Sequence, residues 1–200
     1  MSFKINTDFT KYMEVFLVQN AILNLISKNE EKFLWEKHIY DSLGIKLFLE
    51  KYSPKVNTLL DIGTGGGFPA VPIALEYPNI EVFALDSIRK KINAIENIKQ
   101  ELSIKNLTTI CDRAENIEQK FYIITSRAVA TIDILVKYAA PLLRKNGYFV
   151  AYKSRLADKE INDAKYLIKK LGLKLIDIIE YTLPLEEVYE RKLVVLQKII

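Results

Sequence analysis

The decisive stretch of this sequence is LLDIGTGGGF, residues 59–68. Its apolar start ends in a carboxylate, a glycine-rich turn follows, and Phe68-Pro69 opens another apolar segment. This order predicts a strand, a ligand-binding loop and a helix. Glycine suits such a loop because its backbone takes unusual dihedral angles and approaches a ligand more closely than any side chain permits.

The chain around this stretch predicts an α/β fold. From residue 56 short apolar strands alternate with helices, as in a doubly wound, Rossmann-like parallel sheet. We expect seven strands, near residues 57–62, 80–86, 107–111, 121–126, 147–153, 173–181 and 192–198. We expect helices near residues 69–77, 88–103, 131–143 and 156–171. Because no helix separates the last two strands, the mostly parallel sheet should end in an antiparallel edge hairpin.

Residues 1–55 are expected to form a helical extension that caps a core at residues 56–200, within one compact domain. Apolar residues at three- and four-residue steps predict one helix within residues 8–27 and another from about residue 30 to residue 52. Ser53-Pro54 should end the second helix, because the residue before a proline is disfavoured in the helical conformation.

The composition limits which classes of protein this sequence can belong to. A chain of 200 residues that is half hydrophobic suits one domain with a sizeable core, and its single cysteine excludes an internal disulfide. Its apolar segments are too short to span a membrane and no signal peptide follows Met1, so we expect a cytoplasmic protein without membrane contact. Residues 127–200 carry 14 Lys and Arg against 9 Asp and Glu, which favours an anionic partner there. Nothing in the pattern indicates a metal site or an obligate protein partner.

Two classes of ligand compete for a glycine loop after a first strand. The dinucleotide fingerprint G-x-G-x-x-G needs a third glycine where this sequence has Phe68. The pattern D-x-G-x-G-x-G, which starts at Asp61 and includes Gly63 and Gly65, is instead the first motif of class I S-adenosylmethionine-dependent methyltransferases. A carboxylate beside the loop suits the cationic methionine end of that cofactor and disfavours a diphosphate. We therefore predict S-adenosylmethionine as the cofactor, and an NAD-dependent oxidoreductase is the less favoured alternative.

Two further strand ends predict contacts with this cofactor. Asp86 ends the second strand, where its carboxylate can accept hydrogen bonds from both hydroxyls of a ribose. Ala114 and Glu115 follow the third strand, where a backbone amide and a carboxylate can flank an adenine edge.

The end of the fourth strand, Ser126-Arg127-Ala128, should face the transferable methyl group. It lacks the Asn/Asp-Pro-Pro-aromatic motif of enzymes that methylate exocyclic amines, and the cysteine nucleophile that pyrimidine C5 methylation requires. The methyl acceptor should therefore be an atom with a free lone pair, or a hydroxyl that needs a base. A small molecule is an alternative acceptor at this point.

Several separated segments carry a resemblance that spans nearly the whole chain. They are Asn24-Leu25, His38-Ile39-Tyr40-Asp41-Ser42-Leu43, Leu60 to Phe68 with Pro69 and Pro72, Leu85-Asp86-Ser87, Arg89-Lys90-Lys91, Arg113-Ala114-Glu115, Ser126-Arg127-Ala128, Tyr152-Lys153 and Arg191 to Val195. Together they resemble the bacterial small-subunit ribosomal RNA methyltransferase family RsmG, also called GidB. This sequence departs from the family pattern at Ile26, Tyr152 and Ser154, where the family has Thr, Leu and Gly.

The resemblance implies methyl transfer from S-adenosylmethionine to N7 of a guanine in 16S ribosomal RNA, with that RNA or the small subunit as the partner. It implies cofactor contacts at Gly63, Phe68, Ala114, Glu115 and Arg127. No catalytic residue is assigned, because N7 has an exposed lone pair and needs positioning rather than a base. Arg127 is the nearest candidate, but we expect it at the cofactor carboxylate or an RNA phosphate, since a cation would oppose the charge that develops on the base.

Basic residues on the ligand side of the sheet predict RNA contacts. Arg89, Lys90 and Lys91 at the start of a helix, with Lys153 and Arg155 after the fifth strand, can hold phosphates. The alternative for residues 89–91 is a solvated helix end.

His38 and Asp41 lie about one helical turn apart and should face the same way. We favour a polar clamp that holds the helical extension against the core over a catalytic pair.

Overall fold

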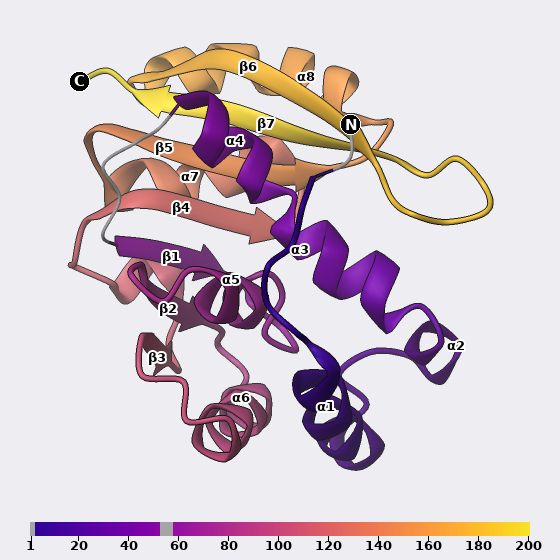
Figure 1. Ribbon diagram of the computed structural model, residues 1–200. Helices are drawn as coiled ribbons and strands as arrows, with labels where there is room; N and C mark the ends of the chain where they lie inside the picture. The colour runs from indigo at the N-terminus through magenta and orange to yellow at the C-terminus, as the bar shows by residue number, and fades with distance from the viewer. Residues whose placement is uncertain (1–2, 53–57) are drawn as a thin grey trace.

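A central sheet of seven strands crosses the molecule in the computed structural model, which describes residues 3–52 and 58–200 (Figure 1). The strands are β1 (Thr58–Ile62), β2 (Glu81–Leu85), β3 (Leu107–Ile110), β4 (Phe121–Arg127), β5 (Leu143–Lys153), β6 (Leu173–Thr182) and β7 (Glu190–Lys198). They lie in the order β3-β2-β1-β4-β5-β7-β6.

The sheet is mostly parallel. Strands β1 to β5 pair in parallel, while β7 runs antiparallel to both β5 and β6. This confirms the predicted seven-stranded sheet with an antiparallel hairpin at one edge. The strand order reverses between β1 and β4, and ligands of such sheets bind at the carboxyl ends of the strands beside that point.

Helices cover both faces of the sheet (Figure 1). After β1 they are α5 (Ala70–Glu76), α6 (Arg89–Glu101), the 3-10 helix η2 (Ala114–Asn116), α7 (Ile132–Leu142) and α8 (Ala157–Lys170). Leu59 packs with α5 and α6 on one face, and Leu60 packs with α7 and α8 on the other, because successive side chains of a strand point to opposite faces. Both leucines are fully buried.

The N-terminal region is helical, but its second predicted helix is not continuous. The first is α1 (Thr10–Leu23). The rest divides into α2 (Lys28–Glu31), the π-helix η1 (Leu34–Tyr40), α3 (Asp41–Leu43) and α4 (Ile45–Tyr52). Gly44 separates α3 from α4, and a Cβ atom there would lie 2.7 Å from the ring of Tyr181. The prediction of one continuous helix from about residue 30 to residue 52 was therefore wrong, because a turn at residues 32–33, the π-helix and a turn at Gly44 divide the segment.

The N-terminal helices pack into the same apolar core as the sheet. Phe16, Leu34 and Phe48 are buried in one cluster with Leu59 and Val82. The predicted helix end at Ser53-Pro54 and the predicted division at residue 56 lie outside the described residues, so the division stays a prediction. None of the helices described in residues 3–52 and 58–200 is long and apolar enough to cross a membrane.

Candidate active site

A cavity of about 870 Å³ opens at the carboxyl ends of β1, β2 and β4. One wall comes from the sheet: the glycine loop, the ends of β2 and β3, and the segment after β4. The other wall comes from the N-terminal helices. The lining residues are 24–27, Glu30, His38, 62–66, Phe68, 85–88, Lys91, 112–115, 127–129 and Tyr138.

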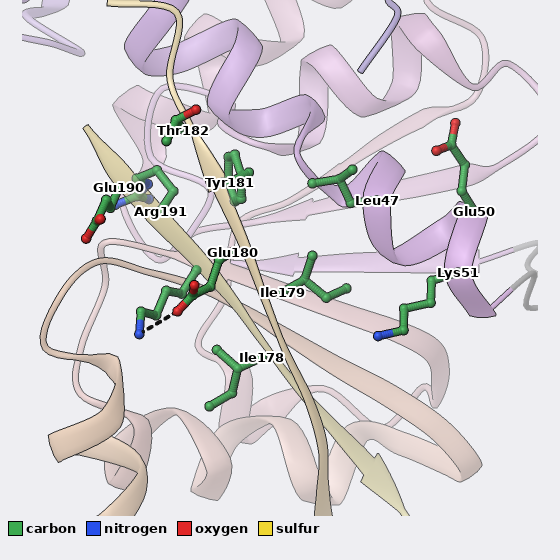
Figure 2. Close-up of a pocket in the computed structure, with 11 residues that line it drawn as sticks. Leu47, Glu50, Lys51, Ile178, Ile179, Glu180, Tyr181, Thr182, Glu190 and Arg191 are labelled. Atoms are coloured by element: carbon green, nitrogen blue, oxygen red, sulfur yellow. Dashed lines mark ion pairs between the residues drawn. The ribbon is translucent and has the colours of Figure 1, made fainter. Parts of the chain in front are cut away.

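A cavity of equal volume lies elsewhere, between α4 and the β6–β7 hairpin (Figure 2). Its cations are paired within the protein: Lys51 with Asp177, Lys192 with Glu180, and Arg191 with Asp41. The strand ends that carry the predicted ligand residues do not reach it. We therefore place the candidate site in the first cavity.

The glycine loop has the backbone that its sequence predicts. Gly63, Gly65 and Gly67 have φ angles of +71°, +59° and +95°, a region that strains other residues. A Cβ atom on Gly67 would lie 2.7 Å from Val71, whereas a Cβ atom on Gly65 would meet nothing nearer than 4.0 Å. Because Gly65 also lines the cavity, its missing side chain leaves that space open to a ligand.

Asp86 holds the loop in place. Its Oδ2 atom accepts a hydrogen bond from the backbone N–H of Gly65 at 3.0 Å, and its Oδ1 atom accepts one from Ile88 at 2.9 Å. Asp86 also lines the cavity. Each carboxylate oxygen has a second lone pair, so the predicted contact with a ribose is compatible with this arrangement and stays a prediction.

Asp61 lies outside the set of residues that line the cavity. Its side chain is fully buried at the end of β1, and Oδ1 accepts a hydrogen bond from the Thr125 hydroxyl at 2.9 Å. Burial raises the pKa of Asp61 to about 7. The expected contact with a cationic cofactor end therefore stays a prediction, and the hydrogen bond of Asp61 in this geometry joins β1 to β4.

Arg127 lines the cavity, but much of its guanidinium is committed to the N-terminal helices. Nη1 donates to the backbone carbonyl of Lys37 at 2.8 Å and to Asp41 Oδ2 at 3.0 Å, and Nη2 lies 3.2 Å from His38 Nδ1. The guanidinium also lies over the ring of Phe68, 5.3 Å from its centroid. The predicted contact of Arg127 with a cofactor carboxylate or a phosphate stays a prediction.

Asp41 joins three parts of the fold. It is 2% exposed and accepts hydrogen bonds from Arg127 on β4, and from Arg191 and Tyr181 on the edge hairpin. Burial acts to raise the pKa of Asp41, but the Arg191 and Arg127 guanidiniums outweigh it and lower the pKa. This is the geometry of the predicted polar clamp.

His38 contributes to the same clamp through Arg127, without a hydrogen bond to Asp41. Its ring packs against Phe68, with the centroids 5.0 Å apart. Burial, followed by the charge of Arg127, lowers the pKa of His38 to about 4, so the ring is neutral at pH 7.

The remaining predicted cofactor residues gather at the cavity. Ala114 and Glu115 line it from η2, and Gly63, Gly65, Phe68 and Asp86 line it from the ends of β1 and β2. Seven of the eight predicted positions therefore share one cavity wall, with Asp61 as the exception.

The predicted RNA-binding residues divide into two groups. Lys91 lines the cavity, and Arg89 and Lys90 are exposed beside it at the start of α6. Lys153 is 9% exposed; its Nζ atom pairs with Glu160 at 2.7 Å and donates to the Ala130 carbonyl at 2.6 Å. The prediction of a phosphate contact at Lys153 is corrected, because its charge is satisfied inside the protein. Arg155 is exposed.

The sequence did not single out Glu30, Tyr181 or Arg191 as site residues. Arg191 stood in the resemblance only as part of a segment, and the acceptor of its hydrogen bonds is 150 residues away in the chain. Glu30 lies on the short helix α2, which precedes η1, and it lines the cavity. Apolar periodicity carries no signal for either placement.

Solved structures share the fold at low sequence identity. The YcgJ protein of Bacillus subtilis superposes with a TM-score of 0.62 at 16% identity, over 80% of this chain and 98% of that one. The TYW2 protein of M. jannaschii, solved in complex with AdoMet, gives a TM-score of 0.60 at 15% identity, over 78% of this chain and 77% of that one. These likenesses show a class I methyltransferase fold.

Other proteins are more similar to this chain in sequence than these solved structures are. A Bacillus subtilis (strain 168) protein named Ribosomal RNA small subunit methyltransferase G is 36% identical over 197 residues, which cover 96% of this chain and 81% of the relative. A Clostridium botulinum protein of the same name is also 36% identical, with the same coverage. The GidB family profile, described as rRNA small subunit methyltransferase G, matches residues 5–189. The chain therefore belongs to the GidB family.

Proposed function

We propose that this protein uses S-adenosylmethionine to methylate N7 of a guanine in the 16S ribosomal RNA of the small subunit. The observation that carries the proposal is an open cavity of about 870 Å³ over a methyltransferase glycine loop, in a chain of the GidB family. The name shared by its relatives supports ribosomal RNA as the substrate class.

The residues of the cavity fit this cofactor. Its volume lies in the range of small-molecule sites. The loop admits close approach at Gly65, and Asp86 offers free lone pairs for ribose hydroxyls. Glu115 and Ala114 line the same cavity, and we expect them to flank an adenine edge.

The bound cofactor supplies a methyl group on a positively charged sulfur; when the N7 lone pair takes the methyl carbon, the carbon–sulfur electron pair stays on sulfur and no proton leaves. The chain therefore needs no general base, and its task is to orient the base and exclude water. Asp41 and the Lys37 carbonyl hold the Arg127 guanidinium against the N-terminal helices. This keeps a cation from turning toward a base that is gaining positive charge.

The rim of the cavity suits a nucleic acid. Lys91 and Arg113 line the opening, and Arg89 and Lys90 are exposed beside it. The major groove of an A-form helix is too deep and narrow for side chains to read, so the target guanine must lie in a loop or turn out of the stack. Phosphates around such a nucleotide would meet this rim.

The test maps N7-methylguanine in small-subunit RNA. Borohydride reduction followed by aniline cleavage cuts the RNA at this nucleotide, and we expect one cleavage site that is present with the gene and absent without it. Purified protein should restore the site on small subunits from the deletion strain. A cleavage pattern that is unchanged by deletion, or label from the cofactor confined to small metabolites, would overturn the proposal.

A further inference from the structure

The wall that the N-terminal helices give to the cavity contains a donor and an acceptor side by side. His38 projects from η1 and Glu30 from α2, and both line the cavity. His38 Nε2 and Glu30 Oε1 are 3.9 Å apart, which is too far for a hydrogen bond between them.

The neighbours of His38 decide which ring nitrogen carries the proton. An arginine can only donate, and Arg127 Nη2 faces His38 Nδ1 at 3.2 Å. Nδ1 must therefore be the acceptor and Nε2 must carry the hydrogen. This N–H is shielded from water and has no hydrogen-bond partner among the described residues. A buried donor without an acceptor costs folding free energy. The site therefore lacks a hydrogen-bond acceptor for the His38 Nε2–H group.

Glu30 offers the opposite chemistry. Its Oε2 atom accepts a hydrogen bond from the Ser27 hydroxyl at 3.0 Å, and the residue lines the cavity. Its side chain is 44% exposed, so it can move away from His38 and admit a ligand group between them. The remaining lone pairs of the carboxylate can accept from N–H groups.

We propose that Glu30 and His38 read the Watson–Crick edge of the acceptor guanine, with His38 Nε2–H donating to O6 and the Glu30 carboxylate accepting from N1–H and the 2-amino group. The inference rests on the proposed function and deepens it. Guanine presents an acceptor and two donors in a row on this edge, and N7 lies on the other side of O6, free to receive the methyl group. Adenine presents a donor where guanine has O6, and it would leave the His38 N–H unmatched.

The charge of Glu30 supports a neutral base carbonyl over an anionic group as the partner of His38. A carboxylate or phosphate oxygen at Nε2 would lie beside the Glu30 carboxylate and be repelled. The same carboxylate assists the reaction, because methylation at N7 makes the base cationic and its N1–H a stronger donor. The hydrogen bond from N1–H to Glu30 should therefore strengthen toward the transition state.

The test compares two bases at the nucleotide that the cleavage experiment identifies. Small subunits are reconstituted with 16S RNA that carries either guanine or 2-aminopurine there; 2-aminopurine keeps N7 but lacks O6 and N1–H. Dissociation constants with S-adenosylhomocysteine present, and single-turnover methylation rates, are measured for each. We expect wild-type protein to favour guanine by about 10- to 100-fold, the usual discrimination of a matched pair of contacts.

Two variants test the pair. His38→Phe keeps a ring against Phe68 and removes the donor, and Glu30→Gln keeps the size and removes the charge. Each should reduce the preference for guanine to about 3-fold or less. Glu30→Gln should lower the methylation rate more than the affinity for the subunit, and calorimetry should show that both variants bind S-adenosylhomocysteine as wild type does. Glu186→Gln, which removes a carboxylate from the exposed β6–β7 loop, is the control and should keep the wild-type preference.

The outcomes separate this inference from the proposed function. Variants that methylate guanine and keep the full preference over 2-aminopurine overturn the role of Glu30 and His38 and leave the proposed function in place. Loss of S-adenosylhomocysteine binding in the His38 variant would show that His38 acts on the cofactor, directly or through Arg127, and would also overturn the inference. A deletion strain with unchanged N7-methylguanine overturns the proposed function, and this inference with it.

Discussion

Asp61, at the end of β1 beneath the glycine loop, makes stability depend on pH. Burial raises its pKa from 3.8 to about 7, above the value in the unfolded chain. The native state therefore binds more protons than the unfolded state between these values, and the free energy of unfolding falls as the pH rises through that window. Asp61→Asn should remove this fall and raise the free energy of unfolding at about pH 8 by at most roughly 4 kcal/mol, with little change near pH 4. Urea unfolding at both pH values measures it.

His38 has the opposite dependence and must be considered in that experiment. Its pKa falls from 6.5 to about 4, so the unfolded state takes up a proton first as the pH drops, and stability is lost toward acid. The two effects partly cancel in the wild type. The Asp61 prediction therefore concerns the difference between the variant and the wild type, and two parallel curves from pH 4 to pH 8 would contradict it.

Asp41 should contribute strongly to stability through its two ion pairs. Its carboxylate lies at 3.0 Å from Arg127 and 2.8 Å from Arg191, and it is almost fully buried. Asp41→Asn leaves two guanidiniums without an opposing charge, and we expect the free energy of unfolding to fall by about 3–5 kcal/mol. Because the pKa of Asp41 is lowered, its contribution is present above pH 3.8 and is lost as the pH falls further.

Asp158→Asn is the matched control for Asp41. This side chain is 63% exposed and pairs with Lys192 at 2.7 Å, so its loss should change stability by less than about 1 kcal/mol. If the two substitutions lower the free energy of unfolding equally, the buried ion pairs of Asp41 stabilise the fold no more than an exposed pair does.

At the scale of the element, a substitution in the glycine loop can affect both the stability of the fold and the affinity for the cofactor, and a comparison variant distinguishes the two effects. A side chain at Gly65 meets no protein atom nearer than 4.0 Å, but it must adopt a φ angle of +59° and it faces the cavity. Gly65→Ala should destabilise the fold by about 1–2 kcal/mol and weaken S-adenosylhomocysteine binding at least about ten-fold, or 1.4 kcal/mol.

Gly172 provides the comparison for the loop. It follows α8 with a φ angle of +69° and stands outside the residues that line the cavity. Gly172→Ala should bring a similar loss of stability and leave the affinity unchanged in calorimetry. If Gly65→Ala binds the cofactor product as tightly as Gly172→Ala does, the loop does not approach the ligand.

Strands and helices of the sheet were predictable as elements, while the N-terminal helices were only partly so. The apolar run at Leu59-Leu60 is buried on both faces, and such runs signal a strand from local sequence alone. Residues 30–52 have a helical period throughout, yet the chain turns at residues 32–33 and is π-helical at η1. Tyr181 leaves no room for a Cβ atom at Gly44, and the apolar periodicity does not report that contact.

At the scale of the whole molecule, the N-terminal helices and the sheet should unfold together. Trp35, the only tryptophan of the sequence, lies in η1 and packs against the shared core. Because one apolar cluster contains residues of both regions, tryptophan fluorescence and far-UV circular dichroism should give the same urea midpoint. A fluorescence transition that precedes the loss of circular dichroism would show that the N-terminal helices detach first.

The sequence by itself determined the order of strands and helices, the glycine loop, and the class of cofactor that the loop suits. Apolar periodicity, glycine spacing and the carboxylates at strand ends are local signals. From them we predicted Asp86, Ala114 and Glu115 as ligand residues, and all three line one cavity. Tertiary structure alone decided which polar groups meet. Asp41 pairs with partners 86 and 150 residues away, Lys153 turns inward to Glu160, and Glu30 comes to face His38. Hydrogen bonds and ion pairs between different elements depend on how the elements pack, and side-chain spacing along the chain does not encode that packing.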